Sequence, residues 1–364
     1  MKKFVWFLTL MLAFSMVLSA CGGTPATQPP APTTAATEAP ATQAPTEAPT
    51  QAATEAPATQ APAAEVFRVA VVMPSAKNDL AFSQSMYDAL TRVQQEMGKD
   101  KFDFVFSENM FVVDDAAAAI RDYASQGYNL VIAHGSQYGS SLQEIAPDFP
   151  KTSFAWGTTV DTFGQPNIFA YEAASEQGGF VNGVMAATLS KSNVIGVVGP
   201  IETGDAKLYV DGFKAGALSV KPDAKVNVNY IGSCSDTALA AEAANTHISA
   251  GADVMTGSAQ MVVGAIGKAK ENNVLWFGTQ SNQTSLAPSI VVASQVYHWE
   301  GILKEMIGLI QNGTLGGKSF KADLANGGEV IELNPDSTVA SDAKALAETT
   351  IKGISDGTIK ITLP

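Results

Sequence analysis

Cys21 is the residue of this chain with the most specific predicted chemistry. Two lysines precede an almost unbroken apolar run over 4–17, and the tripeptide Leu-Ser-Ala at 18–20 leads to the cysteine. A basic head, an apolar core and small residues are the parts of a secretory signal, and a cysteine directly after Leu-Ser-Ala marks the bacterial lipoprotein form. We therefore expect cleavage after residue 20 and attachment of a diacylglycerol to the Cys21 thiol. An uncleaved anchor is the alternative, although about 17 apolar residues is the lower limit for spanning a bilayer.

The rest of the chain lacks the sequence signatures of several common chemistries. It has no G-x-x-x-x-G-K-[ST] phosphate loop, no H-E-x-x-H metal-binding pair and no G-x-G-x-x-G dinucleotide fingerprint. His134, His247 and His298 are far apart in sequence, and no motif surrounds Cys234. We therefore expect no catalysis, no cofactor and no metal site. Because the thiol of Cys21 is assigned to lipid, Cys234 is the only thiol left and no intrachain disulfide is expected.

Polar and aromatic side chains gather in the segments that follow predicted strands. Aromatic faces, together with side chains that offer both donors and acceptors, are the groups that bind a flat polar ring. Ser233, Ser281 and Tyr297 are among these side chains. The predicted ligand-binding residues are Asn78, Asp79, Phe82, Gln137, Tyr138, Trp156, Asp236, Gly257, Ser258, Gln280, Asn282 and Trp299.

Some of these residues also have purely structural interpretations. Asn78 and Asp79 precede a predicted helix, where Asx side chains accept hydrogen bonds from free backbone N–H groups. Phe82 begins that helix and Trp156 lies on an alternating strand, so both are also candidates for the hydrophobic core. The sequence leaves binding and structural roles open for these four.

The elements that must position these side chains alternate along the chain. Apolar runs predict strands at 66–73, 103–106, 129–133, 152–156, 193–198, 225–231, 252–256, 273–277 and 289–297. Helical patterns lie between them at 82–98, 114–126, 139–147, 175–190, 205–219, 236–250, 258–271 and 300–312. This alternation predicts parallel sheets with helices on both faces. Nine strands favour two similar α/β lobes with a cleft, in which ligands bind beyond the carboxyl ends of strands.

Composition separates a tether from a folded body. Residues 22–64 contain no aromatic or large aliphatic side chain, and the nonapeptide TEAPATQAP occurs at 37–45 and 54–62. Such a segment cannot bury enough apolar area to fold, and its prolines favour an extended spacer. The body from 65 to 364 is long enough for two domains. The net charge of −13 argues against a nucleic-acid partner.

Several stretches resemble, in order, the basic membrane protein family of substrate-binding lipoproteins. The family's opening strand, polar loop and helix resemble FRVAVVMPSAKNDLAFSQSMYDAL. Its most recognisable helix and following strand resemble FAYEAASEQGGFVNGVMAATLSKSNVIGVVG, and AGADVMTGSAQ and LWFGTQSNQ follow in register. The resemblance covers about 66–335. It implies a type I periplasmic-binding-protein fold, with two doubly wound α/β lobes joined by a hinge, and service to an ABC importer. Characterised relatives bind purine nucleosides or purine bases.

The resemblance also implies ligand-binding roles for particular residues. A departure occurs at Gln280 and Asn282, where nucleoside binders of the family carry an aspartate that grips ribose hydroxyls. An amide makes weaker hydrogen bonds to a diol than a carboxylate does, so a free base is as plausible as a nucleoside. The residues that match the family are the polar pair Asn78 and Asp79, the stacking aromatic Phe82, the loop residues Gln137 and Tyr138, and the second-lobe residues Gly257 and Ser258.

The expected organisation follows from this resemblance. Lobe 1 is predicted to contain 65–172 and about 280–300, and lobe 2 to contain 173–279 and about 301–335. The end of the chain, 336–364, is predicted to be a helix and a short strand on either lobe. We expect a lipid-anchored monomer outside the cell membrane that captures a purine nucleoside or base by hinged closure and delivers it to an ABC permease. A ligand-sensing or adhesive surface lipoprotein and an importer component for another small molecule are the alternatives.

Overall fold

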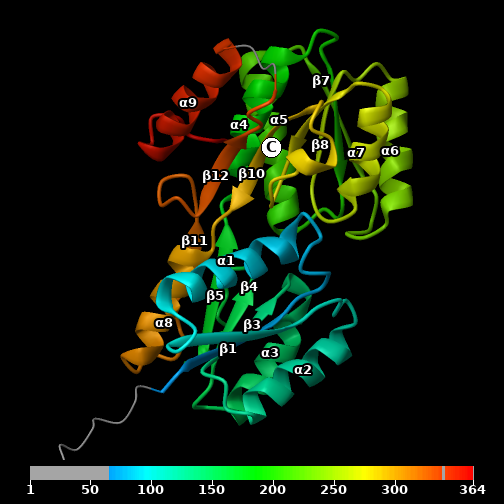
Figure 1. Ribbon diagram of the computed structural model, residues 1–364. Helices are drawn as coiled ribbons and strands as arrows, with labels where there is room; N and C mark the ends of the chain where they lie inside the picture. The colour runs from blue at the N-terminus through cyan, green and yellow to red at the C-terminus, as the bar shows by residue number, and fades with distance from the viewer. Residues whose placement is uncertain (1–64, 338–340, 364) are drawn as a thin grey trace, which may run out of the picture. The chain divides into compact units, whose positions relative to one another are not determined.

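The computed structural model describes residues 65–337 and 341–363. These residues form two six-stranded sheets with helices packed against them (Figure 1). We call each sheet with its helices a lobe, numbered in chain order. The predicted signal peptide 1–20, the lipidated Cys21 and the tether up to residue 64 lie outside the described residues.

The first sheet has the strand order β11-β5-β4-β3-β1-β2, and all its neighbouring strands are parallel. The sequence of β1, FRVAVV, explains its place: only Arg68 is not fully buried, and a continuous apolar run suits a sheet covered on both faces. The strands are β1 (Phe67–Val72), β2 (Phe102–Ser107), β3 (Leu130–His134), β4 (Ser153–Gly157), β5 (Ile168–Ala173) and β11 (Ser319–Ala322).

The second sheet repeats this architecture with the order β12-β10-β9-β8-β6-β7. Its strands are parallel except for β12, which pairs antiparallel with β10 at the edge. Both lobes are therefore built from mostly parallel sheets, as the sequence predicted. The strands are β6 (Val194–Gly199), β7 (Lys225–Tyr230), β8 (Val254–Gly257), β9 (Leu275–Gly278), β10 (Val291–Tyr297) and β12 (Glu329–Leu333).

Helices cover both faces of each sheet. In the first lobe, buried side chains of α1 (Phe82–Met97) and α8 (Glu300–Gln311) form one core, and those of α2 (Val113–Ser125) and α3 (Gly139–Ile145) form another. The second lobe is doubly wound in the same way. One of its cores uses α6 (Thr237–Ser249) and α7 (Val262–Glu271), and the other uses α4 (Ser175–Leu189), α5 (Gly204–Val220) and α9 (Ser341–Ser355).

After the first crossing, the lobe boundaries differ from those predicted. The chain crosses between β5 and α4, between β10 and α8, and between β11 and β12. The assignment of about 280–300 to lobe 1 is wrong for β10, which lies in the second sheet. The assignment of 301–335 to lobe 2 is wrong for α8 and β11, which pack in the first lobe. A buried apolar strand carries no local signal of the sheet that it joins, which is why the sequence did not decide this.

The last segments also differ from the prediction. Helix α9 packs in the second lobe, against α4. The described residues after it, 356–363, form no strand, so the predicted final strand is absent there. Three strands, β5, β11 and β12, were not predicted. Two of these are the edge strands β11 and β12 of the two sheets, and short edge strands carry weak patterns because one of their sides has no neighbour.

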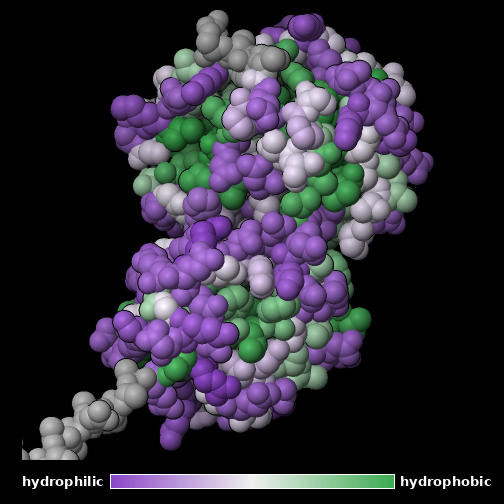
Figure 2. Space-filling view, viewed as in Figure 1, coloured by the Kyte–Doolittle hydropathy of each residue, from purple (hydrophilic) through white to green (hydrophobic). Residues whose placement is uncertain are grey.

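The surface follows from this layering. On the face shown in Figure 2, hydrophilic side chains cover α1 and the outer helices of the second lobe, whose apolar sides pack on the sheets. Across 65–337 and 341–363, no helix has both the length and the apolar character that crossing a membrane requires.

Candidate functional site

A cavity lies where the carboxyl ends of strands from both sheets meet. Its wall is built by residues that follow β1 to β4 in the first lobe and β6 to β9 in the second. This is the position at which doubly wound sheets bind ligands. Its volume is about 80 Å³, whereas pockets for drug-sized ligands measure roughly 300–1,000 Å³. The loops of the two lobes are therefore close together here.

Direct hydrogen bonds join the lobes around this cavity. The Gln260 Nε2 of the second lobe donates to Ser75 Oγ of the first at 2.8 Å, and Ser281 Oγ donates to the carbonyl oxygen of Ala81 at 2.9 Å. Gln283 Nε2 donates to the carbonyl oxygen of Leu80 at 3.3 Å. The three donors belong to the segments that follow β8 and β9 of the second lobe. The cavity is thus closed by polar contacts that separation of the lobes would break.

Asp205 is the only charged side chain in the described wall of the cavity. It lies in the first turn of α5, and its Oδ2 accepts hydrogen bonds from Gln280 Nε2 and the Tyr297 hydroxyl, each at 3.2 Å. Part of its surface remains accessible through the cavity, and protein atoms surround the rest. This burial raises the pKa of the carboxyl group, and hydrogen bonds from Gln280, Tyr297 and Thr158 partly oppose the shift.

Two aromatic rings line the cavity, the exposed Phe111 and the nearly buried Phe82. The Phe82 ring stacks on the imidazole of His134, with the ring centroids 3.8 Å apart and the planes 8° from parallel. The His134 Nε2 lies 3.0 Å from the carbonyl oxygen of Phe82, and its Nδ1 lies 2.7 Å from the Tyr171 hydroxyl. Since a carbonyl only accepts, Nε2 carries the proton and Nδ1 accepts from Tyr171. Phe82 therefore belongs to the core and also lines the cavity.

Burial of His134 predicts acid destabilisation of the protein. Loss of solvation lowers its pKa from 6.5 to about 3. Below pH 6.5 the unfolded chain binds a proton that the folded protein does not bind, so stability should fall as the pH drops from 6.5 towards 3. Replacing His134 with Gln should lower stability at pH 7 but flatten this decline. Denaturant unfolding of both proteins between pH 7 and pH 4 measures the two slopes, and equal slopes would contradict the assignment.

Two further wall residues adopt an unusual backbone conformation. Ala259 and Gln280 follow β8 and β9, and their φ angles of +68° and +69° lie in the left-handed region. This region costs a non-glycine residue roughly 1–2 kcal/mol. Such residues concentrate at ligand sites, where the surrounding structure holds them in place. The wall thus holds two strained residues, which follow the neighbouring strands β8 and β9.

Three predicted ligand-binding residues line the cavity: Phe82, Gln137 and Gln280. Gly257 ends β8, and Ser258 follows it immediately before the wall residues Ala259 and Gln260. The binding roles of these five residues stay predictions.

Two predicted carboxylates cap helices and do not line the cavity. Asp79 accepts hydrogen bonds from the backbone N–H groups of Ala81, Ser83 and Gln84 at the start of α1. Asp236 accepts from the N–H groups at the start of α6. Asn78 is exposed and outside the cavity wall. The capping interpretation is thus correct for Asp79, because an Asx side chain before a helix satisfies donors that the helix leaves free.

Other predicted residues lie in the cores or elsewhere on the surface. Tyr138 and Trp299 are fully buried, and their polar atoms donate to Met110 O and Ser85 Oγ. Trp156 donates to the Gly135 carbonyl and stacks on Phe163. Asn282 is exposed and donates to Glu332. Tyr138, Trp156 and Asn282 lie close in sequence to wall residues, but none of the four side chains lines the cavity.

The sequence interpretation missed several wall residues. Asp205, Thr158 and Gln260 lie in segments that directly follow β6, β4 and β8, so the rule that selected the other candidates applies to them as well. Cys234 also lies in the wall. Burial, followed by the nearby Asp205 carboxylate, raises the pKa of its thiol to about 11, so it is a poor nucleophile at neutral pH.

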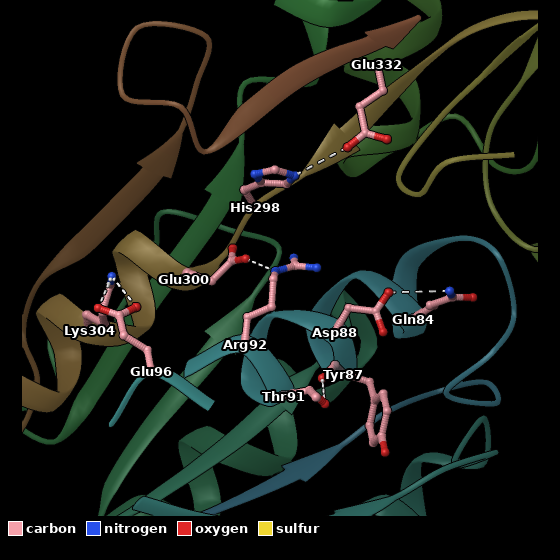
Figure 3. A network of polar contacts seen from close by, with 10 residues as sticks. All are labelled: Gln84, Tyr87, Asp88, Thr91, Arg92, Glu96, His298, Glu300, Lys304 and Glu332. Carbon is pink, nitrogen blue, oxygen red and sulfur yellow. Dashed lines mark hydrogen bonds and ion pairs between the residues drawn. The ribbon is translucent and has the colours of Figure 1, made fainter. Parts of the chain in front are cut away.

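A larger groove lies away from the strand ends. Its volume is about 700 Å³, and α1, α8, β11 and the segment around His298 line it. Its charged groups have ion-pair partners: Arg92 pairs with Glu300, and Glu96 pairs with the nearby Lys304 at 2.9 Å (Figure 3). His298 lies 3.8 Å from Glu332. We favour the smaller strand-end cavity as the site because its polar groups lack full pairing and its position matches the ligand crevice of this architecture.

Within the described part of the chain, no group of three or more His, Cys, Asp or Glu side chains is placed to hold a metal ion. The pentapeptide GISDG at 353–357 matches the G-x-S-x-G nucleophile pattern, but Ser355 ends helix α9, whereas that motif needs a strand-to-helix turn.

Several known proteins are similar to this chain in sequence. A purine-binding protein of Brucella abortus is 26% identical over 293 residues, which cover 80% of this chain and 82% of that protein. A nucleoside-binding protein of an ABC transporter in Lactococcus lactis is 28% identical over 309 residues, 79% and 86% of the two chains. Basic membrane protein A of Borreliella burgdorferi is 25% identical over 240 residues, 64% and 68%, and its name is consistent with membrane association.

The fold and the family of the chain are also shared with known proteins. The ABC transporter solute-binding protein of Conexibacter woesei superimposes with a TM-score of 0.69 at 20% identity, over 82% of this chain and 99% of that one, and shares the fold. The Bmp family, described as ABC transporter substrate-binding protein PnrA-like, matches residues 66–361. Its members are non-enzymatic and work with a small-molecule ligand and the other components of the transporter. The chain belongs to the Bmp family of ABC transporter substrate-binding proteins.

Proposed function

We propose that this protein captures a purine, as a nucleoside or a free base, and presents it to an ABC permease. The observation that carries the proposal is the strand-end cavity, whose wall combines two aromatic rings with uncharged donors and acceptors and one carboxylate. Aromatic faces stack on a purine, and amide and carboxylate groups pair with its edge. The names of two relatives, one purine-binding and one nucleoside-binding, support the same ligand class.

Capture requires the two lobes to move. The cavity of about 80 Å³ admits only a few water molecules, so a purine enters only when the loops separate. The hydrogen bonds from Gln260 to Ser75 and from Ser281 to Ala81 break on opening and re-form on closing. The three chain crossings between the lobes form the hinge of this motion. We take the closed form to be the one that docks on the permease.

We also propose that the protein is held at the outer face of the cell membrane. Support comes from the sequence alone: the signal over 1–20, the cysteine after Leu-Ser-Ala and the spacer up to residue 64. A Cys21→Ser chain should therefore leave the membrane fraction with its ligand affinity unchanged.

A ligand panel tests the proposed function. A compound that binds only the native state at 100 times its dissociation constant stabilises it by about 2.7 kcal/mol. We expect purine bases or purine nucleosides to raise the melting temperature, and sugars and amino acids to leave it unchanged. Pyrimidine nucleosides are the matched control, since they carry the same sugar with a smaller ring. A response only outside the purines would overturn the ligand assignment and favour an importer component for another small molecule.

A further inference from the structure

The strand-end cavity contains two neighbouring acceptor groups, the carboxylate of Asp205 and the amide oxygen of Gln280. Gln280 donates its Nε2–H to Asp205 Oδ2 at 3.2 Å. This bond fixes the amide, because turning it over would bring its oxygen against the carboxylate. Its own oxygen, Oε1, then lies in a side chain that is only 3% exposed and has no hydrogen-bond partner. A buried acceptor without a donor costs about 1–3 kcal/mol.

The second oxygen of Asp205 is also poorly satisfied. The side-chain donor that approaches Oδ1 is the Thr158 hydroxyl, at 3.4 Å. A normal O–H···O bond is about 2.5–3.0 Å long. Because Thr158 belongs to the first lobe and Asp205 to the second, this contact depends on how the lobes close. A donor group between the lobes would fill the position better.

The charge of Asp205 acts in addition to its acceptor capacity. Neither Lys, Arg nor His occurs among the described wall residues, so nothing there neutralises an anionic ligand. The N-terminus of a helix is the usual place to bind a phosphate. At α5 the Asp205 carboxylate itself lies in the first turn, where the helix dipole favours negative charge. The position that would attract a phosphate is therefore already taken by an anion.

We propose that Asp205 and Gln280 together select the ligand: they accept hydrogen bonds from two adjacent donors and reject anionic compounds. The shared ligand chemistry is a pair of N–H or O–H donors about 3 Å apart on a neutral or cationic molecule. An aminated purine edge and a sugar hydroxyl pair both offer it. The inference rests on the proposed function only in placing the ligand in this cavity. The donors can belong either to the base or to the sugar.

The test compares Asp205→Asn with the control Asp236→Asn. Each change removes one carboxylate at the start of a second-lobe helix, Asp205 in the first turn of α5 and Asp236 at the N-cap of α6. Asp236, however, lies outside the cavity wall. Affinities are measured by calorimetry for guanine, hypoxanthine, guanosine, 2′-deoxyguanosine and guanosine 5′-monophosphate. We expect Asp205→Asn to lower the affinity for the best ligand by about ten-fold or more. The variant should also discriminate less between the nucleoside and the monophosphate, and it should melt near the wild-type temperature. Asp236→Asn should change none of the affinities.

The panel separates the two donor sources and the two proposals. Weaker binding of hypoxanthine than of guanine assigns the donors to the base edge, and weaker binding of 2′-deoxyguanosine than of guanosine assigns them to the sugar. If Asp205→Asn binds as the wild type does, or if the monophosphate binds as tightly as the nucleoside, the inference is wrong while the proposed function stands. If the melting-temperature panel finds a neutral or cationic non-purine as the best ligand, and Asp205→Asn binds that ligand more weakly, the proposed function fails and the inference holds. A wild type that binds nothing overturns both.

A second variant, Gln280→Met, distinguishes loss of the Asp205 charge from distortion of the loop. Gln280→Met keeps the length of the side chain and removes both its donor and its unpaired oxygen. We expect it to lose affinity for the same ligand without gaining affinity for the monophosphate, because the Asp205 charge remains. Equal loss of discrimination in both variants would show that distortion of the loop, and not charge, governs selection.

Discussion

Replacing Phe82 with Ala is expected to weaken ligand binding by about ten-fold or more. Phe82 lines the strand-end cavity and is the most buried aromatic ring of its wall. Stacking between an aromatic side chain and a nucleobase contributes about 1–3 kcal/mol, and alanine cannot replace it. Calorimetric titration with the best ligand of the panel measures the loss.

Stability must be separated from affinity in this experiment. The Phe82 ring packs on His134 inside the first-lobe core, and truncating a buried Phe to Ala costs about 3–5 kcal/mol. Phe82→Leu keeps most of the apolar volume but removes the flat ring, so it should lose affinity with a smaller loss of stability.

Phe102→Leu is the matched control for the same core. Phe102 is fully buried there and lies outside the cavity wall. We expect it to lower the melting temperature and to leave the affinity unchanged. If folded Phe82→Leu binds as tightly as the wild type, Phe82 serves only the core, and another part of the wall contacts the ring of the ligand.

The fold was accessible from the sequence because its signals are local. Each of the eight predicted helices has a counterpart within a few residues, for example 82–98 and Phe82–Met97. Alternating apolar runs and helical windows follow from burial on both faces of a sheet, a property of neighbouring residues. The assignment of β10 and α8 to lobes failed because sheet membership depends on contacts between distant segments. No short window of sequence contains that information.

The site was accessible only at the level of loops. Gln137 lines the cavity whereas its neighbour Tyr138 points into the core and donates to Met110, so a change of one residue reverses the direction of a side chain. Asp205 was missed because a carboxylate in the first turn of a helix has an ordinary structural explanation. Its importance appears only when Gln280, 75 residues away in the chain, lies beside it.

The close packing of α4 on α5 leads to the second prediction of large effect. Gly179 and Gly183 of α4 face the backbone of α5, and Gly212 and Gly216 of α5 face the backbone of α4. A Cβ atom on Gly183 would lie far inside van der Waals contact with the carbonyl oxygen of Phe213. Backbone atoms of a packed helix cannot rotate away as a side chain can, so the two helices would have to move apart and their shared core would open.

Gly183→Ala is therefore expected to lower the free energy of unfolding by about 1–3 kcal/mol, the usual cost of overpacking a core. Its matched control is Gly308→Ala in α8, where a Cβ atom would meet nothing within 4 Å. Both changes replace a helical glycine with alanine, which by itself stabilises a helix by roughly 1 kcal/mol. Gly308→Ala should thus raise the melting temperature and Gly183→Ala should lower it. Opposite signs from the same substitution can come only from the surroundings of the two residues, so equal shifts would show that α4 and α5 tolerate a larger separation than their glycines indicate.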